Sequence, residues 1–419
     1  MGTLWKIALR NVFRHGRRTA ITAIVMMMGI GFYIVYDAVI AGMDRLAIDT
    51  MVHYTAGFLK VRTPAYVADE TGTPLDYGIP DPEGTAAKIL KAAPTLTAVA
   101  PRTLFIGQAS NYVDAEPVLC AAVDPERDAR VFDLAGNITK GAWLSGSGGQ
   151  AKGVVVSADL ARDLGLQLGG TLVLSARTIY DNDNADEFTI VGIADPGLSL
   201  SAKLYMDYAD ARAFLGDGLP VTELDASAPR APNLDLELSS SAAAATAVRA
   251  AFPALNAQPI GETAKDYLAI RNSKQKGTFM IVLVILLIAA VGIVNTILMS
   301  VYSRVREIGV LRAYGMTAKD IKKLFVREGL IIGAIGSLAG LVMGGGFVAW
   351  LHGSGMSLGA MFNGLDLGAF PANGVLYAEW RPSAFVTGLV FGLVASWLAA
   401  RSPAKRAARL EPTDALHFV

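Results

Sequence analysis

The sequence predicts a membrane protein with four transmembrane α-helices and a large α/β extracytoplasmic domain between the first and the second. Of the 419 residues, 53% are hydrophobic and only 18% are charged, and the mean hydropathy is +0.41. Such values are typical of a chain that places much of its length in a bilayer. A run of about 20 apolar residues is enough to cross the hydrocarbon core. Four stretches approach or meet that length: Ala20–Ala41, Thr278–Met299, Gly329–Leu351 and Ala384–Ala400.

These spans divide the chain into three parts. Residues 1–43 are expected to form an amphipathic N-terminal helix and the first transmembrane helix, residues 44–275 the extracytoplasmic domain, and residues 276–419 a membrane domain with three further transmembrane helices. In Leu4–Arg18, bases alternate with apolar residues, as in a helix that lies on a membrane surface. A cleaved signal peptide is the alternative, but the apolar region is too long for one and no clear cleavage site follows it.

The distribution of charge predicts the orientation in the membrane. Asp44–Lys274 holds 29 acidic and 19 basic residues, a net charge of −10, although the whole chain is neutral. Of the 18 bases outside this segment, 16 lie in Met1–Thr19, Tyr302–Arg327 and Arg401–Val419. Because basic residues near membrane ends stay on the cytoplasmic side, both termini are expected inside and the acidic segment outside. The expected location is the inner, or plasma, membrane.

The acidic segment has the mixture of short strands and helices that is typical of a soluble α/β domain. The candidate strands are Phe58–Arg62, Val118–Val123, Val154–Ser157, Thr171–Ser175, Phe188–Ile193 and Leu234–Leu238. The candidate helices are Pro82–Ala92, Ala158–Leu164, Tyr208–Leu215 and Ser241–Phe252. Ser157 and Asp207 stand where they can cap two of these helices. Six prolines between positions 64 and 101 predict long loops early in the domain.

The residue types that carry catalytic or metal chemistry form no convincing cluster. The single cysteine, Cys120, excludes an intramolecular disulfide, and the four histidines lack the spacing of metal ligands. Asp181–Glu187 looks like a calcium loop but has Ala185 where an EF-hand needs an oxygen ligand, so a solvated hairpin loop fits better. Gly146–Lys152 lacks the Gly-Lys-Ser/Thr ending of a phosphate-binding loop. We therefore expect no catalytic residue, metal, cofactor or nucleic-acid partner, and no binding of ATP by this chain.

Between the second and third spans lies a connecting segment, Tyr302–Arg327, with seven basic and two acidic residues. It predicts two short helices separated at Gly315, because glycine tolerates positive φ at no steric cost. Thr317 and Asp320 have the spacing of a capping box for the second helix. The chain would then leave the membrane, turn and re-enter it. We interpret this segment as the place where a cytosolic partner pushes; an ordinary positively charged loop is the alternative.

Within the connecting segment, the sequence REIGVLRAYG at Arg306–Gly315 is similar to the signature of the MacB/LolC/LolE/FtsX-type ABC transporter permeases, where it holds the coupling helix. Pro403–Leu416 looks like the ending of that family, and Ala8–Arg14 resembles its opening. Val123–Pro125 and Lys140–Leu144 are similar to parts of its periplasmic core. The resemblance covers essentially the whole chain and is closest to the LolC/LolE-like lipoprotein-releasing permeases.

This resemblance implies a set of domains and partners. Residues 44–275 would be a MacB-like periplasmic core domain, and residues 276–419 an FtsX-like permease domain. MacB proper carries its ATPase fused at the amino terminus, for which this chain is expected to have no room. ATP hydrolysis is therefore expected in a separate pair of cytosolic ABC ATPase subunits, and this chain would be a non-catalytic subunit. The other implied partners are a second permease copy or a homologue, membrane lipid, and an extracytoplasmic cargo such as a lipoprotein.

The resemblance also implies the residues that make these contacts. The coupling residues that would touch the ATPase are Arg306, Glu307, Gly309, Arg312, Gly315, Met316 and Thr317. Asn295, a polar residue in the second span, is expected to form an interhelical hydrogen bond at a permease–permease contact. The second span, expected to be continuous with the first helix of the connecting segment, would carry the motion to the outer domain.

The implied function is mechanical transmission, with release of lipoproteins from the outer leaflet as the favoured outcome. The spans show no polar pathway, which argues against carrying a hydrophilic solute through the bilayer. Two alternatives remain open: an FtsX-like scaffold that activates a cell-wall hydrolase, and MacB-like efflux of peptides or small molecules. An ectoenzyme with a membrane anchor is disfavoured, because an anchor needs only one span and Asp44–Lys274 shows no convergent catalytic set.

Overall fold

The computed structural model describes residues 3–14, 16–145, 152–196, 200, 202–357 and 375–409. Most of the glycine-rich stretch Gly146–Lys152 and the end of Pro403–Leu416 lie outside the described residues. The chain divides into two compact units. Unit 1 comprises Met1–Asp44, Ile270–Met356 and Leu376–Val419, and unit 2 comprises Arg45–Ala269 and Ser357–Val375.

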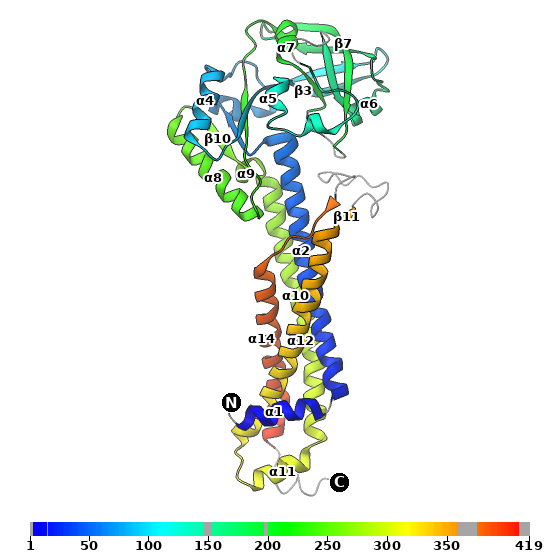
Figure 1. The fold of residues 1–419 in the computed structure, drawn as a ribbon, viewed down its shortest axis with the longest axis vertical. Coiled ribbons are helices and arrows are strands. Elements are labelled where there is room, and N and C mark those ends of the chain that lie inside the picture. Colours follow the sequence, from blue (N-terminus) through cyan, green and yellow to red (C-terminus); the bar gives the residue numbers. More distant parts are fainter. Residues whose placement is uncertain are drawn as a thin grey trace. The chain divides into compact units, whose positions relative to one another are not determined.

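Unit 1 is built on four long helices that run side by side (Figure 1). They are α2 (Gly16–Met51), α10 (Lys265–Tyr302), α12 (Ala318–Ser354) and α14 (Pro382–Ala408). All four are long and apolar enough to cross a membrane, which confirms the four predicted spans. Each helix extends beyond the apolar stretch that predicted it, and the boundary between the two units falls within α2 and α10.

Glycines on α12 bring the long helices into close contact. A Cβ atom at Gly336 would lie 2.5 Å from the Cβ of Met26 on α2, and one at Gly340 would lie 2.9 Å from the Cβ of Ile30. On another face of α12, a Cβ at Gly333 would overlap Ser396 of α14. Small residues of this kind let membrane helices approach until their backbones touch. The contact of α12 with α2 and α14 therefore leaves little room for larger side chains.

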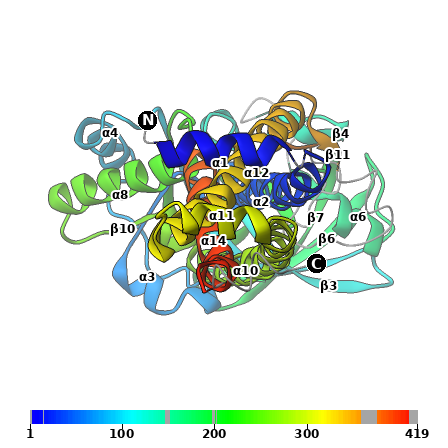
Figure 2. The ribbon, with the colours of Figure 1, turned by 90° about the horizontal axis from the view of Figure 1, so that it is seen from below.

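Two short helices complete unit 1. Helix α1 (Thr3–Arg14) runs across the end of the bundle (Figure 2) and packs Ala8 and Val12 against buried residues of α12. Leu9 and Phe13 remain exposed on the other side of α1, as the amphipathic pattern predicts. Helix α11 (Val305–Ala313) lies in the connecting segment between α10 and α12.

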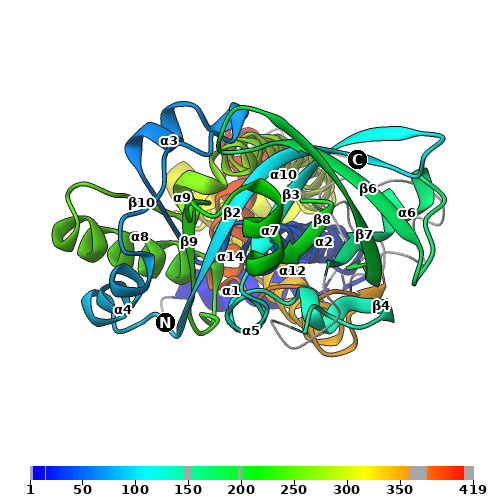
Figure 3. The ribbon, with the colours of Figure 1, turned by 90° about the horizontal axis from the view of Figure 1, so that it is seen from above.

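Unit 2 contains a ten-stranded sheet, part of which closes into a ring (Figure 3). The ring strands are β2 (Ala98–Ser110), β3 (Ala115–Val123), β8 (Leu204–Asp207), β5 (Gly153–Ser157), β7 (Asp183–Ala194) and β6 (Thr171–Arg177), and β6 pairs again with β2. Alternate residues on a strand face opposite sides, so each ring strand gives one side chain in two to a shared core. That core includes Phe105, Cys120, Val156, Leu174, Phe188 and Met206, all buried.

The rest of the sheet extends as a wing beside β2. Its strands, in spatial order from β2, are β9 (Glu223–Ser227), β1 (Leu59–Arg62) and β10 (Asn256–Pro259), while β4 (Ile138–Gly141) pairs with β7. One face of the wing packs against α4 (Pro82–Ala92) and α8 (Leu234–Ala251). The shorter helices are η1 (Val52–Ala56), α3 (Pro64–Ala68), η2 (Glu70–Gly72), α5 (Pro125–Asp128), η3 (Leu134–Asn137), α6 (Ala158–Asp163), α7 (Tyr208–Leu215) and α9 (Ile260–Thr263). Strands β11 (Met356–Ser357) and β12 (Val375–Leu376) form a separate two-stranded sheet.

The other face of the wing carries a buried layer of charged side chains. Lys60 Nζ lies 2.9 Å from Glu223 Oε2 and 3.5 Å from Asp225 Oδ1. Arg102 on β2 pairs with Asp128 at 2.6 Å. Burial, and then the neighbouring Glu223, raise the pKa of Asp225 well above its ordinary value. Burial acts in the same direction on Glu223, but Lys60, Arg62 and Arg102 together outweigh it and lower the pKa of that carboxyl.

Several predicted elements of unit 2 are confirmed, and two predictions are wrong. Ser157 and Asp207 accept backbone N–H bonds at the starts of α6 and α7, as caps should. Leu234–Leu238 is not a strand but the first turns of α8, because Asn233 caps it by accepting the N–H of Leu236 at 2.8 Å. The stretch from Asp183 to Glu187 belongs to β7 rather than to a loop, and the hairpin turn lies just before it.

Candidate coupling site

The connecting segment contains the predicted turn. Helix α11 ends at Ala313, Gly315 has φ of +93°, and α12 begins after Thr317. Thr317 Oγ1 accepts the N–H of Asp320 at 3.2 Å and donates its own proton to the Asp320 carboxylate at 2.6 Å. The predicted break at Gly315 and the predicted cap at Thr317 are therefore confirmed. The Asp320 carboxylate bonds the Thr317 hydroxyl.

The predicted continuity between the second span and the first helix of the connecting segment is wrong. Helix α10 ends at Tyr302 and α11 begins at Val305, and Arg304 between them has φ −127° and ψ 20°, outside the helical region. The side chain of Arg304 explains the break, since it turns inward. Its Nε donates to Glu307 at 2.8 Å and its terminal nitrogen donates to Glu328 at 2.9 Å. Helix α11 is therefore joined to α10 through a non-helical residue, Arg304, and is not a straight extension of α10.

The same ion pairs join three helices at this joint. Glu307 of α11 also pairs with Arg14 of α1 at 3.0 Å, and Glu328 of α12 also accepts a bond from Asn11 of α1 at 2.7 Å. The side chains of Arg304 and Glu328 are only 7% and 5% exposed, so solvent screens their attraction little. The Arg304 hydrogen bond, followed by the charges of Arg304 and Arg14, lowers the pKa of Glu307 against a smaller opposing effect of burial. We call these five residues the joint network.

A further bond ties α11 to α14. Arg312 donates to the backbone carbonyl of Ala408 at 3.1 Å, at the last turn of α14, where the helix dipole favours a positive charge. Ile308 and Gly309 are buried on the inner side of α11, and Met316 packs partly against the same core. The inner side of α11 is therefore held by the bundle at several points.

The outer side of α11 presents an exposed face, which we define as Arg306, Val310 and Tyr314. These residues are four positions apart, so they lie on one side of the helix. Val310 is 41% exposed and Tyr314 is 88% exposed. Val310 and Tyr314 were not among the coupling residues predicted from the sequence, because the charged residues give the stronger signal in this segment. The signal available was an apolar residue and an aromatic residue at helical spacing in an otherwise polar helix.

The structure separates the seven predicted coupling residues into two groups. Arg306, Gly315 and Thr317 are exposed. Glu307 is exposed and bonded to α1, and Arg312 is half-buried and bonded to α14. Gly309 is buried and Met316 is half-buried. Arg304, which was not among the predicted residues, bonds both Glu307 and Glu328.

Asn295 lies on the outward side of α10. Its side chain is exposed, whereas the neighbouring Thr296 turns inward and its hydroxyl lies 2.5 Å from that of Thr22 on α2. The exposed stripe around Asn295 includes Leu287, Val291, Met299 and Tyr302. An amide on the outside of a membrane helix lacks a hydrogen-bond partner in lipid, which makes this position unusual on the stripe.

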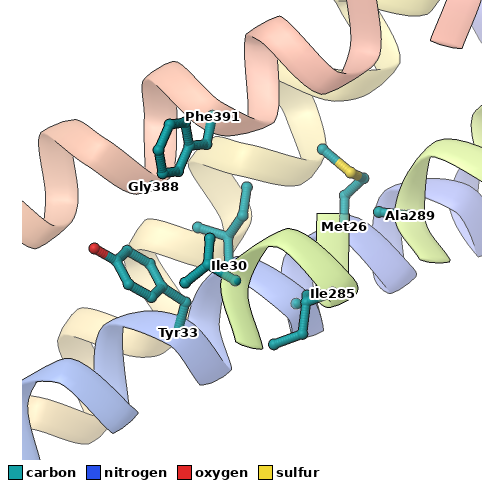
Figure 4. Close-up of a pocket in the computed structure, with 9 residues that line it drawn as sticks. Met26, Ile30, Tyr33, Ile285, Ala289, Gly388 and Phe391 are labelled. Carbon is teal, nitrogen blue, oxygen red and sulfur yellow. The ribbon is translucent and has the colours of Figure 1, made fainter. Parts of the chain in front are cut away.

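An apolar pocket lies among α2, α10 and α14 (Figure 4). The pocket is shallow and partly open to the surface, and its labelled lining residues are Met26, Ile30, Tyr33, Ile285, Ala289, Gly388 and Phe391. In the described part of the chain, no three His, Cys, Asp or Glu residues lie close enough to hold a metal ion. The bundle thus offers apolar surface rather than catalytic groups in the residues that are described.

Four helices able to cross a membrane, with a large α/β unit inserted between the first and second, define a multi-pass membrane protein of the permease type. Residues 279–412 match the family model "FtsX-like permease C-terminal", and residues 19–254 match "MacB-like periplasmic core domain". The second match alone covers more than half of the chain. The chain therefore belongs to the MacB/FtsX-type ABC transporter permeases.

Curated relatives share part of this chain. The macrolide export ATP-binding/permease protein MacB of Hyphomonas neptunium is 37% identical over 131 residues, which is 31% of this chain and 17% of that protein. The pyoverdine export ATP-binding/permease protein PvdT of Pseudomonas syringae pv. tomato is 34% identical over 131 residues, with the same coverage. The matched part is thus less than a fifth of the length of either relative. Among solved structures, the extracellular domain of the ABC-type transporter YknZ from Gram-positive bacteria matches 48% of this chain and 98% of its own, with 12% identity and a TM-score of 0.33.

Proposed function

We propose that this chain is a non-catalytic permease subunit that receives movement from cytosolic ABC ATPase subunits at the connecting segment. The proposal rests on the different environments of the two sides of α11. Glu307 and Arg312 of α11 are bonded to α1 and α14, and Arg304 just before α11 is bonded to α12. Val310 and Tyr314 on the outer side of α11 are exposed. A helix held in this way transfers a push on its outer side to three other helices at once. In this arrangement both termini and the connecting segment are cytoplasmic, and the membrane is the inner, or plasma, membrane.

We assign the contact with the ATPase to the exposed face of α11 and the turn that follows it. Arg306, Gly315 and Thr317 are exposed and would touch the partner, together with Val310 and Tyr314. Glu307, Gly309, Arg312 and Met316 would set the position and tilt of α11 instead. Aromatic residues and arginine dominate the energy of protein interfaces, which suits Tyr314 and Arg306 as anchors.

The route of the motion follows from the joint at Arg304. A displacement of α11 would act on α12 through the Arg304–Glu328 pair, and α12 is in backbone contact with α2 at Gly336 and Gly340. Because the hydrogen bonds of a helix are internal, α12 and α2 can move as rigid bodies in lipid. Residues 44–275, entered by way of α2, would be the extracytoplasmic domain that uses the motion; residues 1–43 and 276–419 would form the membrane part.

We further propose that two permeases meet through the outward side of α10. Asn295 is exposed there, and a second copy or a homologue could supply the hydrogen-bond partner that lipid cannot. If the two-fold axis of a homodimer passes next to Asn295, the two Asn295 amides would meet across it.

For the cargo we propose, first, a lipoprotein that is released from the outer leaflet. In the described residues the interior of unit 1 is packed with apolar side chains and glycines, which suits a cargo that stays at the outer surface. Efflux of peptides or small molecules is the second candidate. It is favoured by the names of the relatives, which are export proteins for macrolides and pyoverdine.

Reconstitution of the native complex in proteoliposomes would decide between these cargoes. The complex would be purified from the native membrane with its ATPase, and given either a fluorescent triacylated lipoprotein or a fluorescent macrolide. ATP-dependent transfer of the lipoprotein to a soluble acceptor, without movement of the macrolide, supports release. Movement of the macrolide alone would replace the first candidate with efflux. Activation of a cell-wall hydrolase, with neither cargo moved, would favour the scaffold.

A further inference from the structure

Helix α1 crosses the end of the bundle between α11 and the membrane-spanning segments (Figure 1). Its inner side packs Ala8 and Val12 against buried residues of α12. On one flank of that side, Arg14 pairs with Glu307 of α11 at 3.0 Å. The opposite flank and the side away from α12 are therefore the surfaces that α1 offers to a partner.

The flank of α1 opposite Arg14 is apolar. Successive residues of a helix are about 100° apart, so Leu9 and Phe13, each one position after a buried residue, lie together on one flank. Arg14 lies two positions after Val12 and so on the other flank. Leu9 is 45% exposed and Phe13 is 68% exposed. Because Arg14 faces α11, the apolar flank faces back toward the membrane-spanning segments.

The side of α1 away from α12, and the start of α2 that follows it, are basic. Lys6 and Arg10 lie four positions apart on α1, Arg17 and Arg18 follow in the first turn of α2, and all four residues are exposed. None of them forms an ion pair or a side-chain hydrogen bond with another residue that the structure describes. The sequence has no acidic residue before Asp37. We call these four basic residues the basic surface.

An apolar flank next to a basic surface fits the boundary between lipid headgroups and acyl chains. Lys and Arg can keep their charged ends among headgroups while apolar side chains of the same helix enter the hydrocarbon. The charge of the basic surface favours an anionic headgroup, since a zwitterionic headgroup has no net negative charge. An acidic soluble protein could neutralise the same charge, but Leu9 and Phe13 face the spans, where lipid lies.

We propose that α1 and the first turn of α2 bind anionic phospholipid of the membrane, with headgroups on the basic surface and acyl chains against Leu9 and Phe13. Lipid bound there also restrains α11, because Arg14 ties α1 to Glu307. The content of anionic lipid would therefore set how firmly α11 is held. The lipid contact itself does not depend on the proposed contact with the ATPase.

Hydrogen–deuterium exchange of the full chain in nanodiscs tests this contact. The nanodiscs would contain phosphatidylcholine alone or phosphatidylcholine with phosphatidylglycerol; since both leaflets have the same lipids, the test does not depend on the orientation of the chain. Each basic residue near an anionic surface strengthens binding about fivefold. Bound lipid stabilises the attached state of α1, so its amides should exchange at least about fivefold more slowly with phosphatidylglycerol. Equal exchange of α1 in the two lipids would overturn the proposal.

Matched pairs of substitutions separate the basic surface from a general attraction of the chain to anionic lipid. Lys6→Gln with Arg10→Gln removes two charges of the basic surface and should abolish most of the slowing. Lys319→Gln with Lys322→Gln removes two exposed charges from the first turns of α12 and should preserve it. Equal losses in these two pairs would show that no particular surface is involved. Slowing of α1 by an added ATPase, without any effect of phosphatidylglycerol, would assign the basic surface to a protein partner and contradict the proposal.

The variant Arg14→Gln tests the link to α11. In the native chain, the amides of α11 should slow together with those of α1 when phosphatidylglycerol is present. Arg14→Gln should reduce the slowing in α11 and preserve it in α1, because Arg14 lies on the flank opposite Leu9 and Phe13. The same slowing of α11 in the native chain and in Arg14→Gln would refute the restraint of α11 by bound lipid.

Discussion

The Arg304–Glu328 pair allows the proposed route of motion to be tested separately from stability. Replacing Arg304 with Met keeps a long side chain but removes the charge of Arg304 from its pair with the buried Glu328 carboxylate. Both side chains are more than 90% buried, so solvent cannot replace the lost partner. Removal of one member of such a pair costs about 3–5 kcal/mol. We expect Arg304→Met to lower the free energy of unfolding of unit 1 by an amount of that order.

The double variant Arg304→Met with Glu328→Leu separates the two effects. Exchange of a buried ion pair for apolar residues of similar volume is often neutral or stabilising, by about 1–4 kcal/mol. The double variant should therefore recover the stability of the native chain. It should not recover coupling, because α11 has lost its charged tie to α12.

Stability and coupling would be measured on the same preparations of the native chain, the single variant and the double variant. Unfolding in mixed detergent micelles, followed by circular dichroism, reports stability, and ATP hydrolysis in the reconstituted complex reports coupling. Arg130→Met is the control, since Arg130 is exposed, belongs to unit 2 and lies outside both the joint network and the proposed ATPase contact. A stable double variant whose cargo-dependent ATP hydrolysis equals that of the native complex would refute the reasoning about the joint.

Three further predictions concern other parts of the chain. Tyr314→Ala should weaken binding of the ATPase by at least about 2 kcal/mol in a pull-down titration, as expected for an interface anchor. Tyr180→Ala, a substitution of another exposed tyrosine in unit 2, should not. Gly336→Val should destabilise unit 1 by about 1–3 kcal/mol in detergent unfolding, because its Cβ would meet Met26; full stability would contradict the close contact. Burial and Glu223 raise the pKa of Asp225, so ionisation of Asp225 opposes folding. The free energy of unfolding should therefore fall as pH rises through that raised pKa. Urea titrations at several pH values should show a smaller fall in Asp225→Asn.

The elements that sequence reasoning predicted are those with strong local signals. The four spans are long apolar runs, and α4 and α7 were predicted with the bounds that they have. Gly315 and Thr317 determine the turn through local backbone and capping preferences, and the structure contains both features. Such signals depend on residues close together in the sequence.

The missed elements depend on contacts between distant residues. Strand β2 was not predicted although it is the longest strand, because it contains Pro101, Arg102 and Thr103 among its buried positions. Leu234–Leu238 alternates apolar and acidic residues as a strand does, but the cap at Asn233 and the contact with the wing make it helical. The break at Arg304 could not be predicted, since its cause is Glu328 on another helix. The predicted contact with the ATPase and the pairing at Asn295 stay predictions.

The central claim is that movement enters through the exposed face of α11 from a cytosolic ATPase. It can be tested most directly with one cysteine at position 314. Cys120, the native cysteine, is fully buried and its thiol pKa is raised by burial, so Tyr314→Cys would be the reactive site. A bifunctional thiol cross-linker would be applied to native membranes, and the adduct identified by mass. We predict an adduct with an ABC ATPase subunit, formed in inverted vesicles. An adduct with an extracytoplasmic protein, or labelling of this cysteine from outside intact cells, would contradict the account.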